Sequence, residues 1–379
     1  MIFLARVDER HKWRHPDHPV TVHRAAVARV VIHCPSQVGS STVPGVDELE
    51  RTLDDVVQRT GFTGAVRFDD AGGTRLAKAY GYADRANKIA NTVDTRFAAA
   101  SAAKTFTALT VMSLVERRQV TLDTTARSVL GEDLPLIDDA VTVEQLLAHR
   151  SGIGDYFDED DEGEITDYVL TVPMHQLAAT EDYLRVLGGF PQKFPPGERF
   201  AYCNGGYVVL ALIAERVAGQ PFPRLVQQAV SGPAGMVDTD FPRSDELPAG
   251  TALGYLYEQG PRTNIHHLPV VGTGDGGIYT TVADLHAFWT ALMAGRILPI
   301  ERVKQMTTPR STSPEDPRRY GLGFWLHPTS DVAMLEGYDA GVSFRSSHDP
   351  NAGRTLTVVA NWSDGAWPVS RHLNEVLGF

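Results

Sequence analysis

The stretch that decides the fold assignment reads AAASAAKTF and spans residues 98–106. It opens an apolar segment, residues 100–119, in which large hydrophobic residues recur at helical spacing. Ser101 and Lys104 are three residues apart, so a helix would hold the hydroxyl and the amine on one face, within reach of each other. No other serine in the chain is followed by a lysine three residues later. The small apolar neighbours of the pair predict a buried site.

The pair suits nucleophilic catalysis. A serine hydroxyl is a weak nucleophile until a base takes its proton, and a lysine can be that base where burial or nearby positive charge lowers its pKa. A helix N-terminus also offers N–H groups to an oxygen that becomes negative. Ser101 is therefore a candidate nucleophile and Lys104 its candidate base. On its own, the same four-residue pattern also fits an ordinary surface helix.

A second polar group is Tyr202-Cys203-Asn204, at the start of an apolar helix predicted over residues 204–218. A tyrosine can relay protons between a nucleophile, a leaving group and water. The amide of Asn204 can donate and accept, so it could orient both a lysine and a substrate carbonyl. The alternative interpretation is a core tyrosine beside a helix-capping asparagine.

The remaining pattern places strands at both ends of the chain and helices between them. This predicts an α/β fold in which one antiparallel sheet, flanked by helices, is built from both termini beside an all-helical region. The α/β part would comprise residues 46–120 and 265–379, and the helical region about 121–264. Predicted helices span residues 46–60, 143–149 after Thr142, 282–294 after Thr281 or its neighbour, and 369–377. Predicted strands span residues 64–68, 74–82, 321–326, 332–335, 342–346 and 355–361.

Residues 1–45 are predicted to be an N-terminal extension that is either poorly ordered or an artefact of start-codon choice. Charged residues and a histidine interrupt its stretch 20–34, which is therefore too polar for a signal peptide or a membrane span. A cytoplasmic protein is therefore expected. The net charge of −12 argues against a nucleic-acid partner. The two cysteines, Cys34 and Cys203, form neither a disulfide framework nor a metal-ligand spacing. The adjacent His266 and His267 lack further ligands at suitable spacing, so no metal site is predicted.

Several segments together resemble the serine β-lactamase and penicillin-binding protein superfamily, more narrowly its class C β-lactamase-related branch of esterases and D-peptidases. Ser101-x-x-Lys104 and Tyr202-x-Asn204 carry the resemblance. Four further segments occur in the family's order: LLAHRSGI at 146–153, PGERFAY at 196–202, GDGGIYTT at 274–281 and YGLGFW at 320–325. The resemblance covers the chain from about residue 46 to its C-terminus.

The resemblance implies a β-lactamase-like sandwich plus a helical region, with the active site between them. It implies acylation of Ser101, deacylation by water, and neither a metal nor an organic cofactor. In the family, one N–H donor for the oxyanion is that of the nucleophile and the other comes from a strand with a Lys- or His-x-Gly motif. The substrate would be a small-molecule ester or amide. Nothing in the sequence indicates the oligomeric state.

The sequence departs from that strand motif. In one register Gly337 is the motif glycine, Leu335 replaces the cation or imidazole, and the N–H of Tyr338 becomes the second oxyanion donor. A competing register starts at Tyr338 and puts Ala340 at the glycine. Neither supplies Lys or His, and Arg345 could substitute only if its strand turns it inward.

The missing cation favours a carboxylesterase-like hydrolase over an enzyme that recognises a carboxylate-bearing substrate. D-aminopeptidase or D-amidase activity and β-lactamase or penicillin-binding activity are the alternatives with the same chemistry. An acyltransferase and a non-catalytic ligand-binding protein are further alternatives. The acidic run at residues 155–164 is interpreted as a solvated loop, with the alternative that it lines the cleft and disfavours anionic substrates. His149 is interpreted as a scaffold residue that braces the Ser151-Gly152 turn.

Overall fold

A large antiparallel sheet organises the molecule. The computed structural model describes residues 44–158, 164–312 and 316–379. Within these ranges the main sheet has eight strands in the order β2-β1-β12-β11-β10-β9-β8-β7. Its strands are β1 (Gly64–Asp70), β2 (Gly73–Tyr80), β7 (Ser311–Thr312), β8 (Arg319–Tyr320), β9 (Trp325–Leu326), β10 (Ala333–Asp339), β11 (Val342–Asp349) and β12 (Arg354–Ala360). Two small ladders pair β3 (Tyr82–Asp84) with β4 (Ile89–Ala90) and β5 (Phe97–Ala98) with β6 (Tyr279–Thr280).

The sheet joins the two ends of the chain, as the strand pattern predicted. β12 lies between β1 and β11, and Val66 of β1 is paired with Val358 of β12. β12 is buried over six of its seven residues, which indicates that both of its faces are covered. The predicted α/β fold with one antiparallel sheet is therefore confirmed.

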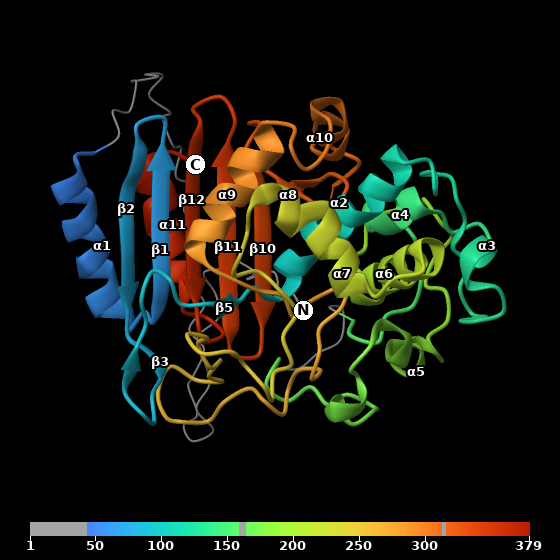
Figure 1. Cartoon of the computed structure of the whole chain (residues 1–379), viewed down its shortest axis with the longest axis horizontal. Helices are drawn as coiled ribbons and strands as arrows, with labels where there is room; N and C mark the ends of the chain where they lie inside the picture. The colour runs from blue at the N-terminus through green and yellow to red at the C-terminus, as the bar shows by residue number, and fades with distance from the viewer. Residues whose placement is uncertain (1–43, 159–163, 313–315) are drawn as a thin grey trace, which may run out of the picture.

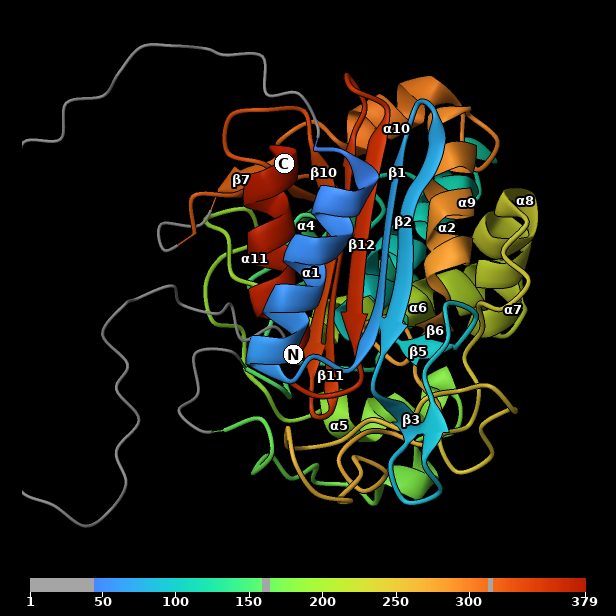
Figure 2. The ribbon, with the colours of Figure 1, turned by 90° about the vertical axis from the view of Figure 1, so that its left-hand side faces the viewer.

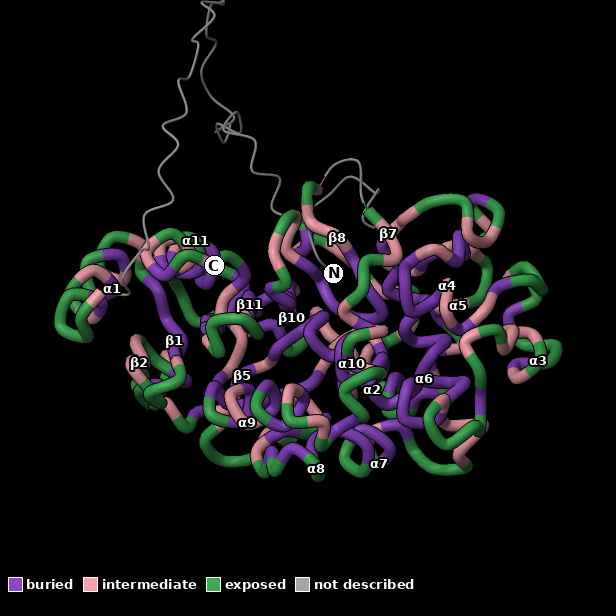
Figure 3. Tube along the Cα trace, turned by 90° about the horizontal axis from the view of Figure 1, so that it is seen from above, coloured by how far each residue is buried: buried purple, intermediate pink, exposed green. Residues whose placement is uncertain are grey.

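Helices cover both faces of this sheet (Figures 1 and 2). α1 (Val46–Thr60) and α11 (Ala366–Leu377) pack on one face, and α9 (Val282–Met293) lies on the other. α1 buries Leu49, Leu53 and Val56, which share one helical face because they are three or four residues apart. Seen from above, the central strands are mostly buried between these two helical layers (Figure 3).

A helical region stands beside the sheet and is centred on α6 (Asn204–Ala218), which contacts α2 (Ala103–Glu116). Thr142 accepts a hydrogen bond from the N–H of Gln145, whose side chain accepts one from the N–H of Thr142, so α4 (Val143–Leu147) begins with a capping box. The other helices are α3 (Ala126–Leu130), α4 (Val143–Leu147), α5 (Leu184–Leu187), α7 (Phe222–Val226), α8 (Gly232–Ala234) and α10 (Ile300–Met306). Short helical turns are η1 (Ala100–Ala102), η2 (Met174–Gln176), η3 (Thr180–Tyr183) and η4 (Gln227–Ser231).

Glycines account for two differences from the predicted strands. The single strand predicted over residues 321–326 is wrong: the N–H of Gly321 donates to the carbonyl of Phe324 and closes a turn between β8 and β9. Gly323 in this turn has a φ of +85°, and a Cβ there would lie 2.2 Å from the Cβ of Ala108. The strand predicted over residues 74–82 stops at Tyr80, because Gly81 has a φ of +70°. The predicted extension lies, up to residue 43, outside the described residues.

Leu53 tests the packing of α1 on the sheet. Its side chain is fully buried, whereas Leu136 is 48% exposed. We expect Leu53→Ala to lower the free energy of unfolding by about 2–5 kcal/mol, because it removes buried methyl groups and leaves a cavity. The matched control Leu136→Ala should change it by less than about 0.5 kcal/mol. Urea unfolding followed by circular dichroism measures both variants, and equal losses would contradict this packing.

Candidate active site

The Ser101–Lys104 pair lies where the main sheet meets the helical region. Ser101 is in η1 and Lys104 is in the first turn of α2, and both side chains are buried. The Nζ atom of Lys104 lies 3.0 Å from the Oγ atom of Ser101. Ala100, just before the serine, has a φ of 46°. A positive φ is unfavourable for a residue with a side chain, so the surrounding structure must hold Ala100 in this conformation. The structure therefore places the predicted nucleophile and base in direct contact.

Two further acceptors hold the Lys104 amine. Its Nζ atom donates to the Oδ1 atom of Asn204 at 2.9 Å and to the backbone carbonyl of Asp275 at 2.8 Å. With the Oγ atom of Ser101, these give the Nζ atom three oxygen partners, so a neutral amine can donate to Asn204 and Asp275 while its lone pair faces the serine hydroxyl. A buried ammonium without such partners would be strongly destabilising. Asn204 was predicted, but the backbone carbonyl of Asp275 was not, since a main-chain acceptor gives no signal in the residue type.

Asp155 anchors the start of α6, and its burial corrects the prediction of a solvated loop at this end of the acidic run. Its carboxylate accepts hydrogen bonds from the N–H of Asn204 at 2.5 Å and the N–H of Gly205 at 2.8 Å. A carboxylate is favoured at a helix N-terminus, where N–H groups lack partners within the helix. Burial raises the pKa of Asp155 to about 6, although these N–H groups oppose the shift. Residues 159–163 of the run lie outside the described residues.

The Tyr202 ring lies in an aromatic stack above the lysine. It packs against His149, with ring centroids 4.2 Å apart, and lies parallel to Trp325. The Nζ atom of Lys104 is 4.9 Å from the centroid of the Tyr202 ring. Burial, together with the charge of Lys104, lowers the pKa of His149 well below its usual value, so this imidazole is neutral at pH 7. Its Nδ1 atom accepts a hydrogen bond from the N–H of Cys203, which agrees with a scaffold role for His149.

The third predicted segment lies on β10, beside the nucleophile. A Cβ on Gly337 would lie 2.1 Å from the carbonyl oxygen of Ala99 and 3.1 Å from the backbone nitrogen of Ser101. Only a glycine allows the strand to approach the nucleophile this closely, which favours the register with Gly337 as the motif glycine. Leu335 is then a buried core residue, 1% exposed. The side chain of Tyr338 packs near Trp367 of α11, with ring centroids 6.1 Å apart.

Glu336, between Leu335 and Gly337 on β10, is the centre of a buried network of ion pairs. Glu336 pairs with Arg318, whose Nη1 atom is 3.0 Å away, and with Arg345, whose Nε atom is 2.6 Å away. Burial by itself would raise the pKa of Glu336, but the charges of Arg318 and Arg345 hold it below its usual value. Arg345 is thereby held on Glu336 and does not replace the missing motif cation.

A pocket adjoins this cluster. Ala100 and Asp275, the neighbour of the nucleophile and the carbonyl partner of Lys104, are part of its wall. Two carboxylates, those of Asp275 and Asp339, line it together with aromatic and apolar side chains. These side chains belong to Tyr156, Phe157, Tyr168, Leu170, Tyr183, Leu268, Pro269, Val270, Tyr279 and Val342. The combination of an apolar surface with a few polar groups is typical of a small-molecule site.

The histidines and cysteines considered in the sequence do not form a metal site or a disulfide among the described residues. Among the described residues, no group of three or more His, Cys, Asp or Glu side chains is arranged to hold a metal ion. His267 lines the pocket singly. Cys203 is a buried free thiol, and Cys34 lies outside the described residues. None of the described helices is both long enough and apolar enough to span a membrane.

Known proteins match this chain over most of its length. A family model described as Beta-lactamase matches residues 49–376. The PbpX protein of Bacillus subtilis, described as a penicillin-binding protein, is 26% identical over 333 residues, which cover 85% of this chain and 78% of PbpX. A D-aminopeptidase of Cereibacter sphaeroides is 26% identical over 323 residues, which cover 83% of this chain but only 59% of that protein. The solved structure of a penicillin-binding protein from Bacillus halodurans is 35% identical, with a TM-score of 0.80, and the match covers 86% of this chain and 99% of that one.

The buried carboxyl group of Asp155 should make the free energy of unfolding depend on pH. Because burial raises the pKa of Asp155 in the fold to about 6, above its ordinary value of 3.8, folding favours the protonated form. Its contribution to stability is therefore full below pH 3.8 and is lost as the pH rises through 6. We expect the wild type to lose on the order of 3 kcal/mol relative to Asp155→Asn over this interval, at about 1.4 kcal/mol per pKa unit.

Urea unfolding of both proteins between pH 4 and pH 7 measures this difference. Asp94→Asn, which removes an exposed carboxylate, serves as the control. Wild-type and Asp155→Asn stabilities that run parallel over the whole interval would contradict the assignment of a raised pKa to Asp155.

Proposed function

The chain belongs to the beta-lactamase family of serine hydrolases, and we propose that it hydrolyses a small ester through an acyl-enzyme on Ser101. The observation that carries the proposal is the contact between Ser101 and Lys104, buried together at the edge of a pocket. The pair is oriented by Asn204 and by the carbonyl of Asp275. A cleft that only bound a ligand would not require this arrangement.

In the proposed reaction, the Oγ atom of Ser101 attacks the substrate carbonyl while the neutral amine of Lys104 takes the serine proton. The carbonyl oxygen becomes an oxyanion, for which the N–H groups of Ser101 and Tyr338 are the proposed donors. Tyr202 passes a proton to the leaving group as the bond to it breaks. Water then attacks the acyl-enzyme, gives up a proton through the same groups, and releases the acid and Ser101.

The chemistry of β10 supports an esterase over an enzyme that recognises a carboxylate. Leu335 stands where the related proteins are expected to present a cation or an imidazole, and it is buried in the core. Arg345 is paired with Glu336. Neither residue offers a positive charge to a substrate carboxylate, so a neutral acyl group is the better fit.

A D-aminopeptidase or D-amidase is the second candidate. The specific observation in its favour is that Asp275 and Asp339 line the pocket, because carboxylates attract the amino group of such substrates. The partial likeness to a D-aminopeptidase is consistent with this candidate, although the chain spans only 59% of that protein's length.

The proposal is tested by the hydrolysis of p-nitrophenyl butyrate, with nitrocefin assayed in parallel. We expect Ser101→Ala to lower kcat for the ester by at least about 10³-fold, because loss of a nucleophile removes the covalent route. Ser113→Ala, the same change on the same helix, is the matched control and should retain turnover, since the Ser113 hydroxyl bonds only to a carbonyl within α2.

Spectrophotometric initial rates at 400 nm for the ester give the comparison. Ester hydrolysis that is equally fast in wild type and Ser101→Ala would refute Ser101 as the nucleophile. Nitrocefin cleavage as fast as ester cleavage would refute the substrate preference inferred from Leu335.

A further inference from the structure

A short segment, residues 155–158, contacts the start of α6 and decides which end of the Asn204 amide faces Lys104. Asp155 accepts hydrogen bonds from the first N–H groups of α6, and the carbonyl oxygen of Phe157 accepts one from the Nδ2 atom of Asn204 at 2.9 Å. A carbonyl oxygen can only accept, so it fixes the NH2 end of the amide and leaves the Oδ1 atom to accept from Lys104. The segment thus orients one acceptor of the lysine amine.

The carbonyl of Asp275, the second acceptor, lies at the tip of a tight turn. Thr273 and Gly276 form an antiparallel bridge, which leaves Asp275 between them on the turn. Gly274 and Gly276 flank Asp275, and a glycine has no side chain to restrain the neighbouring peptide groups. The hydroxyl of Thr107 donates to the carbonyl of Gly274 at 2.6 Å and so holds the turn before Asp275. The direction of the Asp275 carbonyl therefore also requires a contact that holds Asp275 itself.

Tyr156 makes this contact. Its hydroxyl donates a hydrogen bond to the Oδ2 atom of Asp275 at 2.5 Å. Burial and the charge of Asp275 raise the pKa of Tyr156 well above its usual value, so the hydroxyl keeps its proton and remains a donor. A carboxylate acceptor makes such a bond stronger than one between neutral groups. Asp275 is then held by its side chain, while its main-chain carbonyl holds the amine of Lys104.

Two contacts that do not involve Asp275 hold the segment that carries Tyr156. The hydroxyl of Tyr168 donates to the main-chain carbonyl of Tyr156 at 2.5 Å. The Nζ atom of Lys193 pairs with the Oδ2 atom of Asp158 at 2.8 Å. The chain around Tyr156 therefore fixes the position of its hydroxyl, so Tyr156 can act as the anchor and Asp275 as the group that it holds.

We propose that Tyr156 is a positioning residue for the Lys104 amine. Its hydroxyl holds Asp275, whose carbonyl in turn directs this amine toward Ser101. The inference rests on the proposed function, because it concerns the step in which Lys104 takes the proton of Ser101. Tyr156 acts through Asp275 and does not touch the reacting atoms. Without the hydroxyl, the turn no longer holds the amine in one direction and acylation becomes slower, while the ring stays in the wall of the pocket.

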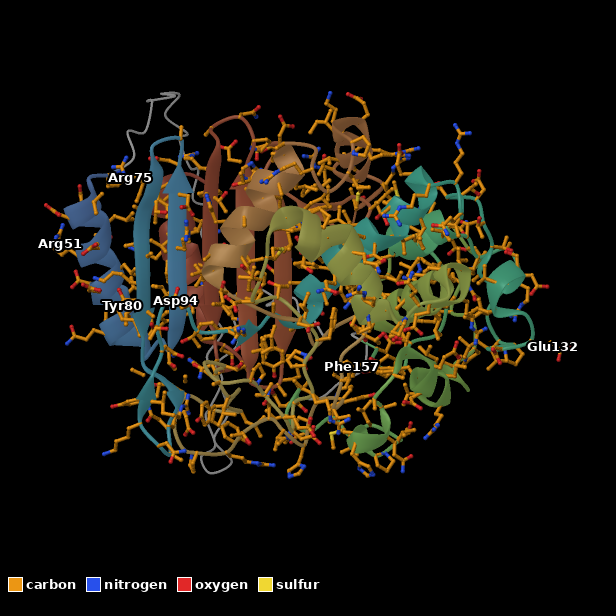
Figure 4. All side chains as sticks on the ribbon, viewed as in Figure 1. Arg51, Arg75, Tyr80, Asp94, Glu132 and Phe157 are labelled. Carbon is orange, nitrogen blue, oxygen red and sulfur yellow. The ribbon has the colours of Figure 1, made fainter. Side chains whose placement is uncertain are left out.

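The test uses Tyr156→Phe, which removes the hydroxyl and keeps the ring. For p-nitrophenyl butyrate, kcat/KM reports the steps up to acylation. We expect it to fall at least about tenfold, because a displaced base loses part of a contribution of roughly 10²–10⁴-fold. The matched control is Tyr80→Phe on β2, which removes a hydroxyl bonded to the carboxylate of Asp54 at 2.6 Å and should keep the wild-type value. Figure 4 labels Tyr80 beside α1, well apart from Phe157, the neighbour of Tyr156 in the chain.

Two changes at Asp275 keep the inference testable where Tyr156→Phe does not fold. Asp275→Ala removes the acceptor of the tyrosine hydroxyl and should lower kcat/KM as much as Tyr156→Phe. Asp275→Asn retains an oxygen acceptor for that hydroxyl and should recover most of this loss with the neutral ester. The double variant that combines Tyr156→Phe with Asp275→Ala should be no slower than either single variant, because both changes remove the same interaction.

The outcomes separate the positioning role from the proposed function. A wild-type kcat/KM in Tyr156→Phe, with hydrolysis that still depends on Ser101, would overturn the positioning role alone. Losses that multiply in the double variant, or equal rates for Asp275→Asn and Asp275→Ala, would also overturn it. Ester hydrolysis that persists in Ser101→Ala, or that the wild type lacks, would overturn the proposed function and the inference together. Losses that Tyr156→Phe and Asp275→Ala share, and that Tyr80→Phe does not show, support the proposal.

Discussion

The buried amine of Lys104 is the interaction on which the rest of the site depends. Its three acceptors come from η1, from α6 and from the loop that carries Asp275. A buried amine, charged or neutral, needs such partners, so each segment must reach its position before the cluster is stable. The requirement ties the sheet side of the molecule to the helical region. The site is therefore also part of what joins the two parts of the fold.

The need to hold the Lys104 amine also explains the contacts made by the residues around it. Asn204 can accept from Lys104 only if the start of α6 is fixed, and Asp155 fixes it by accepting the first N–H groups of that helix. Tyr202 is fixed in turn by the His149 and Trp325 rings. Arg318 packs over the Trp325 ring and also pairs with Glu336 of β10. The aromatic stack and the strand beside Ser101 are thus connected through one guanidinium group.

The sequence predicted the parts that depend on local patterns. The helix bounds at 46–60 and 204–218 agree with the structure, because an apolar face ends in each case at a glycine, Gly61 or Gly219, with a left-handed backbone. Spacing and residue type also identified Ser101, Lys104 and Asn204, which the structure brings together. Asp155 was misjudged because charge runs are usually solvated, and its N–H partners lie 49 and 50 residues away. The role of the Asp275 carbonyl was invisible for a different reason: any residue has such a carbonyl, and only the folded loop aims it at Lys104.

β10 shows how the fold limits the chemistry. Gly337 must lack a side chain to lie against Ser101, and this contact fixes the register of the strand. The alternation of a strand then sends Glu336 and Tyr338 to one face and Leu335, Gly337 and Asp339 to the other. With Leu335 in the core, the one charged side chain that β10 can offer on the nucleophile's face is the carboxylate of Asp339. The strand that the family resemblance led us to expect to present a cation thus presents an anion here, which supports the proposed preference for a substrate without a carboxylate.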